Sequence, residues 1–174
     1  MKSKVTLRPF RVEEVHLYHQ WMTDKNITGQ YVRGEASSLS ELITDFKKTH
    51  WQTQALSRWI CEDKSQNIIG VAQAWKFDLY EDHMEVGRVL LPKFRGAGLG
   101  TDLMLELFNH VFTKYSTGRI QAITPCDNLV TLRTWEKCGM VVEGRLRYFI
   151  SVGDKKLDCF VGSILKSEWE AKKN

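Results

Sequence analysis

Proline and cysteine are scarce in this sequence, and long apolar runs are missing. Its 174 residues include three prolines and four cysteines, and no two cysteines form a Cys-x-x-Cys pair. No apolar stretch approaches the roughly 20 residues needed to span a bilayer, and the first residues lack the apolar segment of a signal peptide. We therefore expect reduced thiols, no disulfide framework, no membrane partner and a cytoplasmic location.

The sequence also lacks a strong charge of either sign. Lys and Arg number 25 against 21 Asp and Glu, which gives a net charge of +4, and the basic residues are scattered. No basic stripe of the kind that binds nucleic acid is present in the sequence. A chain of this length, with 43% hydrophobic residues, suits a single domain over residues 1–174. We expect a monomer or a homodimer.

One stretch, residues 85–112, stands out from the rest of the chain. The apolar run Val86–Leu91 predicts a strand, and Pro92 ends it because proline has no N–H to offer a sheet. Helical periodicity begins near Thr101. Between strand and helix lie glycines at alternate positions, which allow a tight turn and the close approach of a ligand: Gly96, Gly98 and Gly100. A glycine-rich loop that leads into a helix N-terminus is suited to binding phosphate.

Two common phosphate-binding motifs do not fit this spacing. A Walker A loop requires a lysine before Thr101, and none is there. A dinucleotide fingerprint reads Gly-x-Gly-x-x-Gly, with an acidic residue about twenty positions later. Here the loop reads Gly-x-Gly-x-Gly, and residues 113–123 contain no acid. A tight turn that binds no ligand remains the alternative to a phosphate site.

Two motifs resemble those of a known enzyme family. The spacing Arg95-x-x-Gly98-x-Gly100 resembles motif A of the GNAT N-acetyltransferases, which bind acetyl-CoA through its pyrophosphate. The segment from Asn128 to Met140, which contains Glu-Lys-x-Gly-Met, resembles the later signature of that family. The ends of the chain look like the subgroup of ribosomal-protein N-terminal and spermidine acetyltransferases, with Leu-Arg-Pro-Phe at 7–10 and Ser-Glu-Trp at 167–169.

The expected order of strands and helices matches the same family. Periodicity and turn residues predict strands at 4–9, 59–62, 68–80, 86–91, 119–124, 140–150 and 155–165, and helices at 13–23, 39–51, 101–115 and 128–137. Residues 24–36 are expected to form a loop. The resemblance implies an α/β GNAT fold, with a mixed central sheet of about seven strands that is splayed at its centre and carries helices on both faces.

The resemblance also implies where acetyl-CoA, the co-substrate, would bind. In the family the pantetheine arm passes between two splayed central strands, here 89–91 and 123–125, and backbone N–H groups around Leu90 and Leu91 would serve the thioester carbonyl. Asn128 would cap its helix and contact the pantetheine. The complete set of expected cofactor-binding residues is Val89, Leu90, Leu91, Arg95, Gly96, Ala97, Gly98, Leu99, Gly100, Thr101, Asn128 and Thr131.

Acetyl transfer to an amine needs a base and a proton for the departing thiolate. Glu85 occupies the strand position where many members of the family place a carboxylate that acts through water, and His83 is its competitor because its pKa suits proton relay. The alternative for Glu85 is a solvated strand end. The family's usual acid is a tyrosine at the position of Trp135, whose indole N–H cannot serve. A covalent route through Cys126 is not the family habit.

The amine acceptor is less well defined. Family members bind acceptors near the loop that corresponds to residues 24–36, so the expected substrate-binding residues are Tyr31, Trp75 and Phe77. Acidic residues between 78 and 85 offer a pocket for a polyamine, whereas a protein α-amine, with a pKa of about 7.7–8, would suit a weakly defined base. His16 and His19 have no evident third ligand, so we expect no metal. A non-catalytic acyl-CoA sensor is the alternative function.

The glycine-rich loop supplies a direct test of the phosphate site. Gly98→Asp is expected to abolish CoA binding, measured by calorimetry, while leaving the fold largely intact, because a side chain with a negative charge would enter the phosphate site. Retained affinity for CoA would contradict the assignment.

Overall fold

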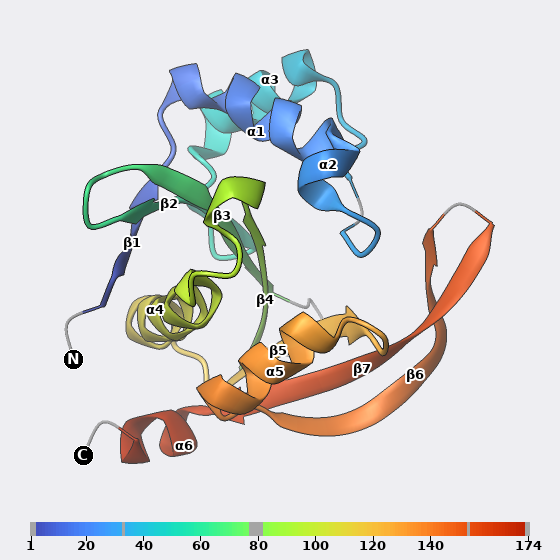
Figure 1. The fold of residues 1–174 in the computed structure, drawn as a ribbon. Coiled ribbons are helices and arrows are strands. Elements are labelled where there is room, and N and C mark those ends of the chain that lie inside the picture. Colours follow the sequence, from blue (N-terminus) through green and yellow to red (C-terminus); the bar gives the residue numbers. More distant parts are fainter. Residues whose placement is uncertain (1–2, 33, 77–81, 153, 173–174) are drawn as a thin grey trace.

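The computed structural model describes residues 3–32, 34–76, 82–152 and 154–172, which form a seven-stranded mixed sheet with helices on both faces (Figure 1). The strand order is β1-β2-β3-β4-β5-β7-β6. The strands are β1 (Val5–Pro9), β2 (Leu56–Asp63), β3 (Ile68–Lys76), β4 (His83–Leu90), β5 (Arg119–Pro125), β6 (Val141–Val152) and β7 (Lys155–Leu165).

The helices divide into two layers. Those described are α1 (Val15–Thr23), α2 (Lys25–Thr28), α3 (Leu39–Thr49), α4 (Leu99–Lys114), α5 (Leu129–Cys138) and α6 (Lys166–Ala171). α1 and α3 cover one face of the sheet, and α4 lies on the other face with α5 next to it (Figure 1). Each layer encloses its own apolar cluster, one around Trp51 and Phe46 and the other around Leu107 and Phe108.

Two helices were missed by the sequence prediction, and the strands expected at 59–62 and 86–91 begin earlier, at Leu56 and His83. Residues 24–36 were expected to be a loop, but residues 25–28 form α2, because the Asp24 carboxylate accepts the N–H of Asn26 at 2.8 Å and caps the turn. The short helix α6 was also missed. It begins where the Glu168 carboxylate accepts the N–H of Leu165 at 2.9 Å. In the described part of the chain, no helix is long and apolar enough to cross a bilayer.

The centre of the sheet is where strand pairing stops. β4 and β5 are parallel and pair only from His83–Glu85 to Arg119–Gln121. Beyond this point β4 stays paired with β3 as far as Leu90, and β5 stays paired with β7 as far as Pro125. The two strands therefore diverge toward their C-terminal ends, as the family resemblance implied. An opening forms in the middle of the sheet.

The segment after β4 turns sharply into α4. A 3-10 turn begins at Pro92, and the chain then passes through Gly96 and Gly98, whose φ angles of 80° and 78° lie in the region that favours glycine. Gly98 is the N-cap of α4. The loop thereby places the first turn of α4, with N–H groups that have no partner within the helix, beside the opening between β4 and β5.

Close packing behind the opening generates a prediction about stability. Trp135 is 1% exposed, and a Cβ on Gly162 of β7 would lie 2.8 Å from its ring. Gly162→Ala is therefore expected to lower the free energy of unfolding by about 1–3 kcal/mol in chemical denaturation, because the ring has no room to move. Gly144→Ala is the matched control in the neighbouring strand, since its Cβ would meet Val161 at an ordinary 3.7 Å. Equal stability of the two variants would contradict this account of the packing.

Candidate active site

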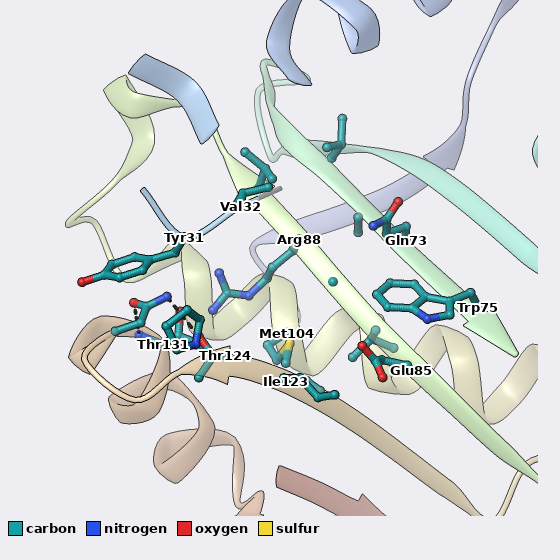
Figure 2. A pocket seen from close by; sticks show the side chains of 18 of the residues that line it. Tyr31, Val32, Gln73, Trp75, Glu85, Arg88, Met104, Ile123, Thr124 and Thr131 are labelled. Atoms are coloured by element: carbon teal, nitrogen blue, oxygen red, sulfur yellow. Dashed lines mark hydrogen bonds between the residues drawn. The ribbon is translucent and has the colours of Figure 1, made fainter. Parts of the chain in front are cut away.

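A cavity of about 460 Å³ passes through the opening between β4 and β5. Its walls come from β3, β4 and β5, with α1 and the residues after α2 on one side of the sheet and α4 and α5 on the other (Figure 2). Of the described residues that line it, two are charged, and both belong to β4: Glu85 and Arg88. The remaining wall is largely apolar and aromatic. A cavity of this kind suits a small-molecule site.

Glu85 lies at the closed end of the opening. It is 8% exposed, and it forms the last residue pair between β4 and β5, with Gln121. The Gln121 side-chain amide donates a hydrogen bond to the Glu85 carboxylate at 3.0 Å. Burial raises the pKa of Glu85 above its ordinary value, and the hydrogen bond from Gln121 offsets part of this effect. A carboxylate with a raised pKa at a cavity wall is suited to accepting a proton.

His83 occupies a different position. It precedes Glu85 by two residues on the same strand and is half-buried, but it does not line the cavity. It lies where β4 and β5 are still paired, near Arg119 and Glu143. Burial is the main reason that its pKa is lowered. The structure therefore brings only Glu85, of the two expected catalytic residues, to the cavity.

The backbone at the end of β4 corrects one expectation. The N–H of Leu91 donates to the carbonyl of Ile69 at 2.9 Å, so the prediction that this N–H serves a ligand is wrong. Successive N–H groups of a strand point to opposite edges, and the N–H of Leu90 therefore faces β5, with which pairing has ended. By the same alternation the N–H of Arg88 faces this edge too, so Leu90 is one of the positions at which a backbone donor faces the opening.

The glycine-rich loop leaves open space above the N-terminus of α4. Gly96 and Gly98 are exposed, and a Cβ on either residue would meet no atom within 4 Å. Ala97 is exposed as well, whereas Leu99, Gly100 and Thr101 are half-buried in the first turn of α4. Helix N-termini with such space attract anions, since their N–H groups and dipole both favour negative charge.

Arg95 does not point into that space. Its Nε donates to the carbonyl of Leu90 at 3.0 Å, and its guanidinium also donates to the carbonyl of Ile27 in α2. Arg95 was expected to bind the cofactor. In the structure its side chain instead joins the end of β4 to α2. This contact joins the loop to α2 and positions both.

The N-terminus of α5 forms the opposite wall. The Asn128 side chain caps the helix by accepting the N–H of Thr131 at 3.3 Å, and it donates to the Thr124 hydroxyl at 3.1 Å. Thr131 lines the cavity beside Asn128. Tyr31 reaches this wall from the other side, because its hydroxyl donates to the carbonyl of Asp127 at 3.3 Å. Val89 of β4 also faces the cavity.

The expected acceptor residues lie on the α1 side of the sheet. Trp75 of β3 pairs directly with Glu85, and both side chains line the cavity beside Gln73 (Figure 2). Phe77 lies outside the described residues, as do Asp78 and Glu81 of the expected acidic pocket. Asp82 does not line the cavity. Its carboxylate points to the start of β5 instead and accepts the N–H of Gly118 at 2.7 Å.

Several cavity residues were missed by sequence analysis. Tyr18 and Met22 reach the cavity from α1, and nothing in a regular amphipathic helix distinguishes them from core residues. Gln121 donates a hydrogen bond to Glu85, which lies 36 residues earlier in the sequence, and only the folded sheet brings the two side chains together. Arg88 did have a signal, since it is a lone charge within the apolar run from Val86 to Leu91.

The described residues contain no group of three or more His, Cys, Asp and Glu side chains that could hold a metal ion. The four cysteines are free thiols, and Cys126 does not line the cavity, although it follows Pro125, which does.

Comparison with known proteins agrees with this geometry. Residues 4–141 match the acetyltransferase (GNAT) domain family. A spermidine N(1)-acetyltransferase of Vibrio cholerae is 25% identical over 153 residues, covering 87% of this chain and 88% of the relative. A putative ribosomal N-acetyltransferase of Bacillus subtilis, YdaF, is 23% identical over 132 residues, covering 76% of this chain and 71% of the relative.

Solved structures agree on the fold. The crystal structure of a Vibrio cholerae spermidine N-acetyltransferase in complex with CoA and spermine has a TM-score of 0.86 at 23% identity and covers 96% of this chain and 98% of that chain. The family match extends over most of the sequence, and the seven-stranded sheet with its central divergence has the expected form. The chain belongs to the GNAT acetyltransferase family and is an enzyme that acetylates amines.

Proposed function

We propose that this enzyme transfers the acetyl group of acetyl-CoA directly to a primary amine that is held against Glu85. The observation that carries the proposal is the position of Glu85, a buried carboxylate at the point where β4 and β5 begin to diverge. A ligand that enters the opening from the loop end would bring its reactive group to this carboxylate. Direct attack then needs only one base on the protein.

The proposed position of acetyl-CoA follows from the open space at the N-terminus of α4 and from the backbone N–H groups that face the gap between β4 and β5. Its pyrophosphate would lie at the N-terminus of α4, above Gly96 and Gly98, where the space is open. Its pantetheine arm would run between β4 and β5, past Leu90 and Asn128. The N–H of Leu90 faces the opening and would donate to the thioester carbonyl, which develops negative charge during attack.

Glu85 would take up the proton that the amine must lose. Burial raises the pKa of Glu85, so its proton affinity is closer to that of the amine than the proton affinity of an exposed carboxylate would be. The smaller difference favours transfer of the proton from the amine to Glu85. Trp75 lies beside Glu85 and offers an aromatic face to a cationic amine before its deprotonation. Gln121 holds the carboxylate in place through its hydrogen bond.

For the acceptor we propose an amine with one reactive ammonium group and a low pKa, such as a protein α-amine or a small monoamine. Among the described residues that line the cavity, Glu85 is the only carboxylate. A polyamine carries several positive charges and calls for several carboxylates, whereas an α-amine, with a pKa of about 7.7–8, presents one charge and loses it easily. The names of the relatives favour a polyamine as the competing acceptor.

The proposed compartment is the cytoplasm. All four cysteines are free, and three of them are buried, which fits a protein kept in a reducing environment.

The raised pKa of Glu85 leads to a prediction about pH. The wild-type rate should rise with pH as the carboxylate ionises, whereas Glu85→Gln should lack this rise and depend only on the fraction of free amine. At neutral pH the variant should lose about 100-fold or more in kcat, as is usual for a general base. The loss should shrink at high pH. The hydrogen bond to Gln121 can be kept by the amide, so the fold should survive.

The matched control is Glu136→Gln, which makes the same change of charge on the exposed surface of α5. It should leave the pH profile of the rate unchanged. A Glu85→Gln enzyme with the wild-type pH profile would rule out Glu85 as the base. Tight binding of acetyl-CoA with no turnover of any amine by the wild-type protein would instead favour the non-catalytic sensor.

The acceptor proposal is tested by comparing amines at equal concentration. Peptides with free N-termini and small monoamines should give a higher kcat/KM than spermidine and spermine, measured by mass spectrometry of the acetylated products. N-terminally blocked peptides serve as the control and should give no product. A preference for spermidine of tenfold or more would overturn the proposed acceptor class while leaving acetyl transfer intact.

A further inference from the structure

Arg88 is a charged side chain on the wall of the cavity that has no part in the proposed phosphate site or in proton transfer to Glu85. It belongs to β4, and its side chain leaves the strand on the side of α4, opposite to Glu85 (Figure 2). Its Nε is buried, and no hydrogen-bond acceptor for it exists in the described part of the chain. Arg88 as a whole is half-buried, and a buried N–H of a cation that lacks an acceptor is destabilising, which suggests that a ligand supplies the partner.

The protein groups near Arg88 do not supply that charge. The thiols of Cys61 and Cys138 are the titratable groups that interact with it, and burial raises the pKa of Cys138 to about 11 and that of Cys61 well above its ordinary value. Both thiols are therefore neutral at physiological pH. Asp102 of α4 forms an ion pair with Lys4 at 3.7 Å.

The position of Arg88 along β4 indicates which part of acetyl-CoA it would contact. It lies between Leu90, which faces the pantetheine path, and Glu85, which faces the amine. The thioester joins these two parts of the reaction. The guanidinium extends from β4 toward Thr124 and Thr131 across the opening (Figure 2). Trp135, at the position of the family's usual acid, lines the same side of the cavity.

We propose that Arg88 faces the sulfur of acetyl-CoA and stabilises the departing thiolate by its positive charge. This role would replace the tyrosine that the family places at position 135. The inference rests on the proposed function, because it requires acetyl-CoA to lie between β4 and β5.

The step balances without a protein acid at the sulfur. The amine nitrogen forms a bond to the thioester carbonyl carbon and gives one proton to Glu85. The C–S bond breaks, and its electron pair stays on sulfur, whose negative charge is paired with the Arg88 guanidinium. Burial lowers the pKa of Arg88, but a guanidinium is not deprotonated in proteins, so Arg88 keeps its own proton. The proton on Glu85 then passes to the thiolate or to solvent, which regenerates the base.

Comparison of CoA with desulfo-CoA, which lacks the sulfur, separates this role from a general effect on the cofactor. In calorimetric titrations of the wild-type protein, CoA should bind more tightly than desulfo-CoA, and the difference should grow as pH rises and the thiolate forms. Arg88→Met should weaken CoA binding about 10- to 100-fold at high pH, as expected for loss of a charge-assisted contact. It should leave desulfo-CoA binding within about twofold of the wild-type value. Arg88→Lys should keep part of the pH dependence.

Two controls make the result specific. Arg133→Met removes a charge from the exposed surface of α5, and it should leave both affinities unchanged. Met is chosen at position 88 because apolar replacement of a buried charge is often neutral or stabilising, and the Tm of the variant checks the fold. If the variant does not fold, the wild-type comparison still decides, because equal pH dependence for CoA and desulfo-CoA would overturn the proposal.

The failures can be told apart. An equal loss of both affinities in Arg88→Met would mean that Arg88 contacts the phosphates or the pantetheine, and the sulfur role would be wrong. If neither compound binds to the wild-type protein, the proposed function itself fails.

Discussion

The site depends on the early end of pairing between β4 and β5. Two adjacent parallel strands normally share their hydrogen bonds along their whole length, and here they do so only from His83 to Glu85. Each strand is held by its other neighbour, β3 for β4 and β7 for β5, so the backbone remains paired on those sides. The divergence creates a cavity through the sheet, with backbone groups such as the N–H of Leu90 facing it.

Two opposite charges line this cavity from the two faces of one strand. Successive side chains of a strand point to opposite faces of the sheet. Glu85 and Arg88 are three residues apart, so Glu85 faces the amine side and Arg88 faces the α4 side. Glu85 is buried and Arg88 is half-buried, which strengthens any interaction with charge that develops between them. In the account proposed here, one accepts the amine proton and the other stabilises the thiolate, so charge forms at both ends of the acetyl group at the same time.

Much of this arrangement could be predicted from local sequence. Pro92, the alternate glycines and Asn128 act through the backbone near them, and their positions predicted the end of a strand, a tight loop and a helix cap. The helix expected at 39–51 likewise begins, as α3, at a capping box that Ser38 and Glu41 form within one turn. The element order then indicated the splayed sheet, and with the two motifs it indicated the family.

What could not be predicted depends on contacts between distant segments. The hydrogen bond from Gln121 to Glu85 and the use of Arg95 to join β4 to α2 both require the assembled fold. The N–H of Leu91 was assigned to a ligand, but the register of β3 directs it to Ile69. Arg88 illustrates a different omission, since its charge within an apolar strand was visible in the sequence but its surroundings were not.

A crystal structure of the enzyme with CoA and an unreactive analogue of the amine would test the central claim most directly. We expect the pantetheine arm between β4 and β5, the sulfur within hydrogen-bonding distance of the Arg88 guanidinium, and the amine against the Glu85 carboxylate. CoA bound outside the opening, or a sulfur that faces away from both β4 charges, would contradict it.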